Sequence, residues 1–316
     1  MPARQAAPKS AYRIRNRTPY NDALVRRGSL TPWVEQETPQ ARRCQGPSQR
    51  GAQSRFSDPA IEGPLTLRCV YPLTLRATEG FARSLFGPME VDLSVPDYTT
   101  IRRRAATVRI TPPKKATGPP HLVSDGTGLK VYGEGEWRVR QHGSSKRRTR
   151  RKPHLAVDPQ THEIQAAMVT DPGVTDAETV AALLERVENP IDSAAGDGAY
   201  DRRVVYDAWD SRSAPAVVPP RRDARIQRHG NTSGPRLARD EDLRRIREVG
   251  RAAWKEESGY HERSLAETAM FRMKTLFGDG VASRCSPQQA TEAGVRCRAL
   301  NIRTHQGMPR SERVAA

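Results

Sequence analysis

Apolar and polar residues follow one pattern before residue 112 and another after it. In the first part, apolar residues recur three or four positions apart at 57–70, 72–87 and 96–104, which predicts short amphipathic helices. In the second part, short apolar runs alternate with helical stretches, which predicts strands joined by helices. The proline-rich segment 112–120, PPKKATGPP, separates the two patterns and is predicted to be a linker between domains.

The first part predicts a helical DNA-binding region over residues 20–111, preceded by a polar, basic and disordered tail at 1–19. Gly63 and Pro64 lie inside its first long helix and are expected to kink or shorten it. Short helices with tight turns, the last carrying consecutive arginines, resemble a helix-turn-helix DNA-binding domain. A helical bundle with a solvated basic face explains the same pattern. In the DNA-binding interpretation, the contacts come from Arg102, Arg103 and Arg104.

The second part predicts the element order β-β-β-α-β-α-β, which is that of the RNase H-like fold. We therefore expect an α/β catalytic domain at 121–278 with an insertion at 221–257, followed by a C-terminal helix and tail at 279–316. Asp125 ends the first strand and Asp197 follows the fourth, and these strands are neighbours in such a sheet. The predicted strands are 121–125, 154–158, 163–169, 193–197 and 216–218, and Asp176 and Asp201 are expected to cap the two helices.

The stretch 258–278, SGYHERSLAETAMFRMKTLFG, predicts a helix that Ser258 caps and Gly278 ends. At about 100° per residue, one stripe roughly 60° wide carries a phenol, a guanidinium, a carboxylate and an ammonium group beside an apolar stripe. One acid among three phosphate-binding groups suits a metal-assisted phosphate site. An exposed, self-paired charged face is the alternative, and geometry alone favours it because such faces are common. The four residues are Tyr260, Arg263, Glu267 and Lys274.

The charge balance favours a polyanionic partner. The chain holds 53 Lys and Arg against 36 Asp and Glu, a net charge of +17, and most of the basic residues are arginine, whose forked guanidinium binds phosphate. A coding bias toward arginine is the alternative cause. A basic run at 146–152 is expected to follow the DNA backbone, and a solvated loop is its plainer interpretation. The residues of this run that we assign to DNA are Lys146, Arg147, Arg148, Arg150 and Arg151.

Composition argues against several classes of protein. The longest uninterrupted apolar run, Val180–Leu184, falls far below the roughly 20 residues of a membrane-spanning helix. The N-terminus lacks the apolar region of a signal peptide. The four cysteines are scattered without a CxxC pair, which argues against a disulfide framework or a zinc site. We therefore expect a cytoplasmic protein without a membrane partner, associated with the nucleoid through DNA.

The spacing Tyr260-x2-Arg263-x3-Glu267-x6-Lys274 resembles the YREK motif of DDE-type bacterial insertion-sequence transposases. Other segments are similar to the same family. Residues 121–133 resemble the segment that holds its first Asp, residues 196–201 the segment that holds its second, and residues 21–33 its N-terminal region. The likeness covers about residues 11–309 and is closest to the insertion-sequence family numbered five.

This resemblance implies a transposase that cleaves double-stranded DNA at terminal inverted repeats and joins the ends to target DNA. It implies that Asp125, Asp197 and Glu267 are catalytic and hold two Mg²⁺ ions, which Mn²⁺ can replace, with Asp125 bridging both ions. It also assigns DNA contacts near the scissile phosphate to Tyr260, Arg263 and Lys274. Because two DNA ends must be paired, we expect a homodimer on DNA.

The sequence also departs from the family pattern. Ser124 stands where a branched apolar residue is usual, and Gly126 replaces a usual serine beside Asp125. Two other classes of function therefore stay open. One is a catalytically dead or domesticated relic that binds DNA without cutting it. The other is a different RNase H-like nuclease that hydrolyses without strand transfer. Further departures are the prolines Pro32, Pro64 and Pro153.

Overall fold

The central sheet is mixed and follows the predicted order. In this computed structural model, β4 (Arg150–Val157) pairs antiparallel with β2 (His121–Gly126) on one side and with β5 (Ile164–Thr170) on the other. Next to β2 lie β6 (Ser193–Ala195) and then β7 (Ala216–Val217), each parallel to its neighbour. The adjacency of the first and fourth predicted strands is therefore confirmed. The structure describes residues 11–29, 43–44, 55–86, 94–115, 118–131, 150–228 and 237–314.

Two short strands extend this sheet beyond the sequence prediction. β3 (Leu129–Val131) continues β2 along the same edge of β4, because the register that pairs Gly126 with His154 also pairs Leu129 with Arg151. β8 (Gly280–Val281) then pairs in parallel with β3. This extension brings the chain that follows the predicted 258–278 helix back onto the sheet.

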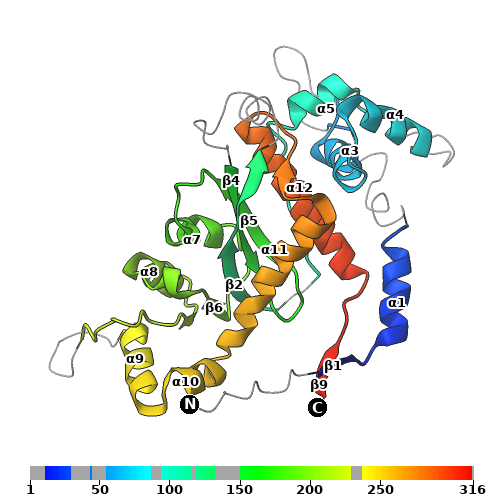
Figure 1. The fold of residues 1–316 in the computed structure, drawn as a ribbon. Coiled ribbons are helices and arrows are strands. Elements are labelled where there is room, and N and C mark those ends of the chain that lie inside the picture. Colours follow the sequence, from blue (N-terminus) through cyan, green and yellow to red (C-terminus); the bar gives the residue numbers. More distant parts are fainter. Residues whose placement is uncertain are drawn as a thin grey trace, which may run out of the picture.

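Helices cover both faces of the sheet (Figure 1). One face carries α7 (Asp176–Leu184) and α8 (Arg203–Asp210), and the other carries α11 (Ser264–Phe277) and α12 (Ser286–His305). β4 alternates between these two cores, with Ala156 in the first and Leu155 and Val157 in the second. This alternation is why a nearly continuous apolar run forms a strand that is buried on both sides.

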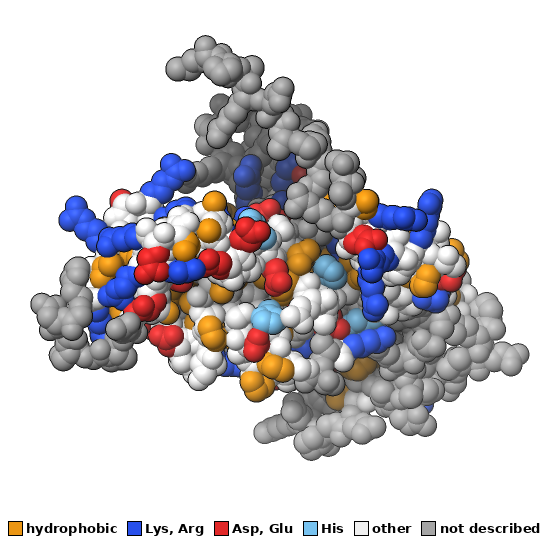
Figure 2. All heavy atoms as spheres, turned by 90° about the horizontal axis from the view of Figure 1, so that it is seen from below, with side chains coloured by type: hydrophobic (Ala, Val, Ile, Leu, Met, Phe, Trp, Pro, Cys, Tyr) orange, Lys and Arg blue, Asp and Glu red, His pale blue; other side chains and the backbone are white. Residues whose placement is uncertain are grey.

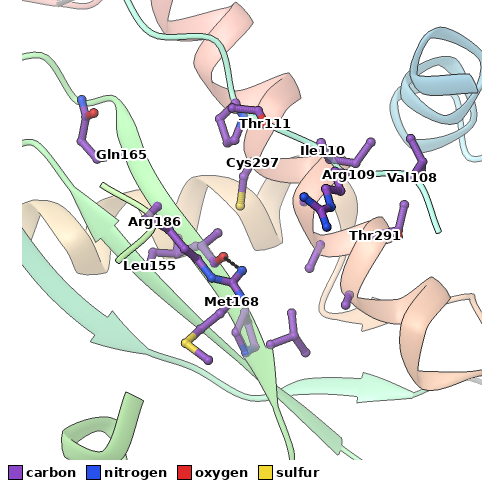
Figure 3. A pocket seen from close by; sticks show the side chains of 18 of the residues that line it. Val108, Arg109, Ile110, Thr111, Leu155, Gln165, Met168, Arg186, Thr291 and Cys297 are labelled. Carbon is purple, nitrogen blue, oxygen red and sulfur yellow. Dashed lines mark hydrogen bonds between the residues drawn. The ribbon is translucent and has the colours of Figure 1, made fainter. Parts of the chain in front are cut away.

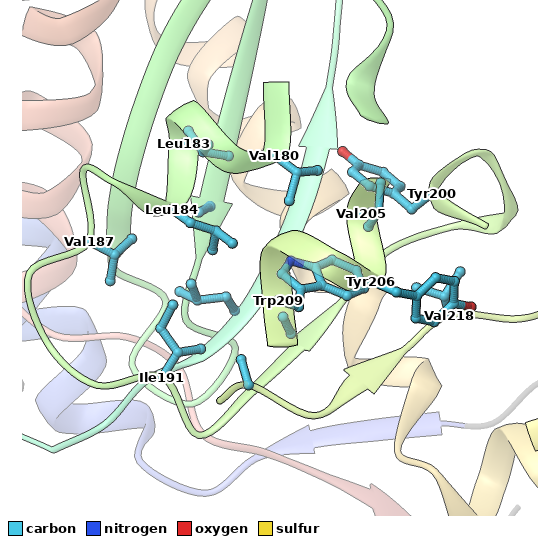
Figure 4. Packing of buried hydrophobic residues seen from close by; sticks show 14 of the residues in the cluster. Val180, Leu183, Leu184, Val187, Ile191, Tyr200, Val205, Tyr206, Trp209 and Val218 are labelled. Atoms are coloured by element: carbon cyan, nitrogen blue, oxygen red, sulfur yellow. The ribbon is translucent and has the colours of Figure 1, made fainter. Parts of the chain in front are cut away.

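Trp209 is the centre of the α7–α8 core (Figure 4). Its indole is fully buried, stacks 6.4 Å from the ring of Tyr200 and meets the ring of Tyr206 edge-on at 6.4 Å. Val180, Leu183 and Leu184 supply the facing stripe of α7. Burial of each such large side chain contributes roughly 1.5–3 kcal/mol, so this core fixes the end of β6 against the rest of the sheet.

The caps of these helices differ from the sequence prediction. Thr175, not Asp176, is the N-cap of α7, and Glu178 accepts the Thr175 backbone N–H at 2.9 Å. Arg202, not Asp201, precedes α8. Both aspartates instead bind basic side chains that are distant in the sequence. Asp176 binds Lys152 and His154, and Asp201 binds Arg239. These pairings determine the surroundings of the candidate site.

The first part of the chain forms α3 (Asp58–Val70), α4 (Leu75–Phe86) and α5 (Tyr98–Arg104). The expected shortening at Pro64 does not occur, because α3 runs on past it to Val70 as one helix. Its Ile61 and Leu65 pack with Val295 of α12. This packing offsets the roughly 3 kcal/mol that a proline inside a helix costs. The helices therefore rest on the C-terminal helix of the catalytic region (Figure 1).

Residues 11–19, expected as part of a disordered tail, form structure with the other end of the chain. β1 (Ala11–Ile14) pairs antiparallel with β9 (Ser311–Val314), and α1 (Arg17–Arg26) follows it. Arg27 donates to the carbonyl oxygens of Arg303 and Gly307. The strand-pairing partner lies about 300 residues away, so no local pattern reveals it.

The predicted insertion forms α9 (Ala238–Val249) and α10 (Arg251–Glu257). Asp201 anchors it, because its buried carboxylate accepts from Arg239 Nε at 2.6 Å and from the Arg221 backbone at 2.8 Å. Asp240 is fully buried and accepts the backbone N–H groups of Gln227 and Arg228. These bonds hold the described parts of the insertion beside the turn that contains Asp197.

A cavity of about 550 Å³ lies between β5, the segment 108–114 and α12 (Figure 3). Arg186 crosses its rim and donates to the carbonyl oxygen of Ala167 at 2.8 Å. None of the three candidate catalytic acids lines it. Within the described ranges, the longest helices are too polar to cross a membrane.

Candidate active site

Asp125 is the second-last residue of β2 and lies on the face that α11 covers. It pairs across the ladder with Leu155, whose side chain belongs to the α11 core. The Gly126 backbone N–H donates to Asp125 Oδ1 at 2.8 Å, which fixes the carboxylate. Burial raises the pKa of Asp125, and the negative charges of Glu267 and Asp176 act in the same direction against the Gly126 bond and Arg263. Burial is therefore the main reason why the pKa of this acid is raised.

Asp197 lies directly after β6, at the same edge of the sheet as Asp125 because β2 and β6 are parallel. Its carboxylate accepts the Ala199 backbone N–H at 2.8 Å and caps the short 3₁₀ turn η1 (Gly198–Tyr200). Burial raises the pKa of the Tyr200 phenol, and the charges of Asp176, Asp125 and Asp197 raise it further. The phenol of Tyr200 is therefore affected by three carboxylates, which lie in one neighbourhood around it.

Glu267 lies in the first turn of α11 and is about half exposed. Its partner is Arg263, which forms an ion pair with it from one turn earlier. Tyr260 and Arg263 do not lie on the same α-helix as Glu267, because Tyr260–Arg263 is a separate 3₁₀ turn, η2. Gly259, with φ of 66°, ends α10 and starts this turn. The single helix predicted over 258–278 is therefore divided in two.

Lys274 extends from the other end of α11 toward the chain that follows Asp125. Its Nζ donates to Thr127 Oγ1 at 2.5 Å. The ammonium group thus lies beside the β2–β3 junction, two residues from the candidate acid. This position agrees with the predicted role of a cation near a phosphate bound at the edge of the sheet.

Tyr260 is half-buried between aromatic and cationic groups. Its ring centre lies 6.3 Å from that of Trp254, with Lys255 Nζ at 5.0 Å and Arg263 Cζ at 5.8 Å. Burial raises the pKa of its phenol, and the charges of Asp197 and Glu267 add to this effect against Arg263. Tyr260 therefore belongs to the same neighbourhood as both acids.

The structure thus brings the three candidate acids near one another without setting them as ready metal ligands. Among the described residues, no three His, Cys, Asp or Glu side chains are arranged to hold a metal ion. Glu267 does not belong to such a group, and its carboxylate is paired with Arg263. The donor chemistry nevertheless fits a hard divalent cation, because carboxylate oxygens are the ligands that Mg²⁺ prefers.

Several basic residues assigned to DNA have structural partners instead. Arg104 forms an ion pair with Asp58 and donates to the Phe56 carbonyl oxygen at 2.7 Å. Arg151 pairs with Asp171 and donates to Gln289 Oε1 at 2.6 Å. Arg102, Arg103 and Arg150 are exposed, whereas Lys146, Arg147 and Arg148 lie outside the described residues. Figure 2 shows acidic and basic side chains interspersed on the face that it presents, which is not uniformly basic.

Sequence reasoning gave His154 and Asp176 no role in the site, and it placed their neighbour Lys152 in the basic run at 146–152. His154 is buried in β4, and Asp176 begins α7, where it was taken for a cap. Lys152 bonds to Asp176. A buried histidine in an apolar strand was the available signal, because buried polar groups need partners.

A mixed sheet of this order, with helices on both faces, is consistent with a DDE or RNase H-like domain. A family model described as "Transposase DDE domain" matches residues 25–134, and a second model of the same description matches residues 116–302. The second match spans more than half of the chain. The protein therefore belongs to the DDE transposases, a family of enzymes that act on DNA.

Proposed function

We propose that the protein is an insertion-sequence transposase of the family numbered five, with Tyr260, Arg263, Glu267 and Lys274 as its YREK motif. It binds the terminal inverted repeats of its element, cleaves the DNA there and joins the ends to target DNA. The observation that carries the proposal is the parallel pairing of β2 with β6, which puts Asp125 and Asp197 at one edge of the sheet, with Glu267 in the first turn of α11 over the same face. Like charges gathered there favour a divalent cation.

Asp125, Asp197 and Glu267 would hold two Mg²⁺ ions, which Mn²⁺ can replace. Such ions would supply activation of the attacking hydroxyl and stabilisation of the leaving oxygen. To take part, Glu267 would have to give up its ion pair with Arg263. Arg263 is then free to bind the DNA backbone near the scissile phosphate, because its guanidinium no longer has an anionic partner.

The DNA contacts divide between two regions. Near the scissile phosphate, Lys274 and Tyr260 grip the backbone or stack on a base. Farther away, the helical region 20–111 reads the terminal repeats through Arg102 and Arg103. The basic run follows the backbone through Lys146, Arg147, Arg148, Arg150 and Arg151. The segment 112–120 joins the helical region to the catalytic domain at 121–278. A homodimer on DNA pairs the two ends.

A catalytically dead relic is the second candidate, and one observation favours it. Glu267 is paired with Arg263, and the described residues contain no preset group of three metal ligands. Such a relic would bind the terminal repeats through the same basic residues, without cutting them. Its DNA affinity would not depend on the three acids.

The test is Mg²⁺-dependent cleavage of DNA that contains the gene with its flanks. Wild type is compared with Asp125→Ala and Glu267→Gln, and Glu262→Gln serves as a matched control because Glu262 is an exposed acid close to Glu267. Cuts at the flanking ends that both active-site variants lose by at least about a hundredfold, and that Glu262→Gln retains, support the transposase. Tight binding of folded wild type without cuts supports the relic.

A further inference from the structure

A charged network lies behind the end of β2, on the opposite side of the sheet from Asp125. Asp176 Oδ2 accepts from Lys152 Nζ at 2.7 Å, and Asp176 Oδ1 lies 3.0 Å from His154 Nδ1. The other ring nitrogen of His154 lies 2.8 Å from Thr170 Oγ1. Lys152 and His154 share one face of β4 because they are two residues apart. Both oxygens of Asp176 therefore have partners.

Gly126 is packed directly against this network. It pairs across the ladder with His154, so its Cα faces the same side of the sheet. A Cβ atom at Gly126 would overlap with Asp176 Oδ1 and would lie 2.9 Å from Lys152 Cε and 3.1 Å from His154 Nδ1. The departure from the usual serine at this position thus has a physical cause, because Asp176 fills the space that a side chain needs.

The network is connected to Asp125 through one backbone group. The Gly126 N–H that donates to Asp125 Oδ1 belongs to the residue whose Cα rests on Asp176. Asp176 is ionised at neutral pH: burial raises its pKa, but the bonds from His154 and Lys152 outweigh burial and lower it overall. Lys152 compensates this charge, so that Asp176 can lie near Asp125 without adding an unpaired anion.

We propose that Asp176, held by Lys152 and His154, is a positioning residue that sets the Gly126 backbone and thereby aims the carboxylate of Asp125 at a divalent cation. The inference rests on the proposed role of Asp125 as a metal ligand. In this proposal Asp176, Lys152 and His154 neither contact DNA nor bind the cation. Loss of such supporting groups typically weakens metal binding or activity by about 10–100-fold.

The first test measures Mn²⁺ binding to the full chain without DNA, by electron paramagnetic resonance of free Mn²⁺. Asp176→Asn is expected to weaken the Asp125-dependent binding by about 10–100-fold. The matched control is Glu163→Gln, which breaks another buried histidine–carboxylate pair, with His305 at 2.7 Å, beside the other end of β4. This control should leave the Mn²⁺ affinity unchanged. Equal affinities of folded Asp176→Asn and wild type would overturn the inference.

The second test asks whether Gly126 and Asp176 act together. Gly126→Ala alone should weaken Mn²⁺ binding because the new methyl group displaces the Asp176 carboxylate. Asp176→Ala removes that carboxylate, so the double variant should bind Mn²⁺ no more weakly than Asp176→Ala alone. If the double variant instead loses Mn²⁺ affinity by the full product of the two single losses, the residues act independently and the inference fails.

A further pair of variants is used if Asp176→Asn does not fold. Lys152→Met is then compared with Lys152→Arg, since arginine retains a cation for Asp176 and methionine does not. Rescue of Mn²⁺ affinity by arginine supports positioning, and equal affinities of the two variants contradict it.

DNA cleavage separates failure of this inference from failure of the proposed function. If wild type binds Mn²⁺ through Asp125 but never cuts flanked DNA, the transposase proposal is overturned. The Mn²⁺ affinities of the variants still decide the positioning role of Asp176. If wild type cuts DNA and Asp176→Asn binds Mn²⁺ as tightly as wild type, only the positioning role is overturned. Absence of any Asp125-dependent Mn²⁺ binding overturns both.

Discussion

Arg263 forms an ion pair with Glu267, and the two residues lie on different kinds of helix. Arg263 ends the 3₁₀ turn η2, while Glu267 lies in the first turn of α11. The pair therefore bridges the junction between the two elements. It also means that a cation must compete with Arg263 for this carboxylate.

Replacement of Arg263 should reveal that competition. Arg263→Gln is expected to strengthen Mn²⁺ binding by up to about fivefold at pH 8, because a partly exposed ion pair contributes at most about 1 kcal/mol. The same variant should weaken DNA binding in a mobility-shift assay, since one phosphate-binding group is lost. An unchanged Mn²⁺ affinity would show that the pair does not compete with the cation.

Asp125→Asn should make the metal-free protein more stable at pH 7 while abolishing cleavage. Because the pKa of Asp125 is raised in the fold, its stabilising contribution is present below the unfolded pKa and is lost as the pH rises through the folded pKa. Asparagine cannot ionise, so the difference in Tm should be positive at pH 7 and should shrink toward acid pH. Scanning calorimetry at pH 4 and pH 7 measures it. A lower Tm at pH 7 would contradict this assignment.

Asp242 should give the insertion a pH dependence near neutrality. Burial raises its pKa to about 6, although Trp254 Nε1 donates to Oδ1 at 3.0 Å and opposes the shift. Stability should therefore fall as the pH rises through about 6. Asp242→Asn should stabilise the protein at pH 8 by about 1–2 kcal/mol, a value reduced for partial exposure, with no gain below pH 4. Urea unfolding at both pH values checks it, and a gain that is the same at pH 4 and pH 8 would exclude titration of Asp242.

The Asp201–Arg239 pair should be essential for docking of the insertion. Asp201→Asn breaks a pair whose carboxylate is fully buried, at a cost of about 3–5 kcal/mol. The variant should unfold at lower temperature and be cut faster by trypsin between residues 221 and 251. Glu257→Gln is the matched control because it breaks an exposed pair with Arg245 in the same insertion, and its Tm should stay unchanged. Equal Tm losses in both variants would contradict the importance of burial.

The sequence predicted the elements whose signal is local. The spacing of Val180, Leu183 and Leu184 gave α7 because these residues form one buried stripe. The β-order placed Asp125 and Asp197 at neighbouring strand ends, and the parallel pairing of β2 with β6 confirms it. Both successes depend on hydrophobic periodicity, which burial imposes directly on the sequence.

The contacts that the sequence did not predict join residues far apart along the chain. Arg104 meets Asp58 across 46 positions and His154 meets Asp176 across 22, so neither pairing leaves a periodic pattern. Gly259, whose positive φ separates α10 from η2, lies before Tyr260 and therefore did not mark the change from η2 to α11. The regular angle of 100° per residue assumed one uninterrupted helix, but the ion pair of Arg263 with Glu267, one turn apart, still follows the predicted stripe.

The ribbon of β1 and β9 delays completion of the fold until the chain has been synthesised as far as β9. Ala11 pairs with Val314, so β1 leaves the ribosome about 300 residues before its partner is made. At roughly 5–20 residues per second, the nascent chain carries an unpaired strand for about 15–60 s. During that interval β1 is available to any other extended segment, including the same strand of a chain on a neighbouring ribosome. Closure of the ribbon therefore has to wait until residues 311–314 have been made.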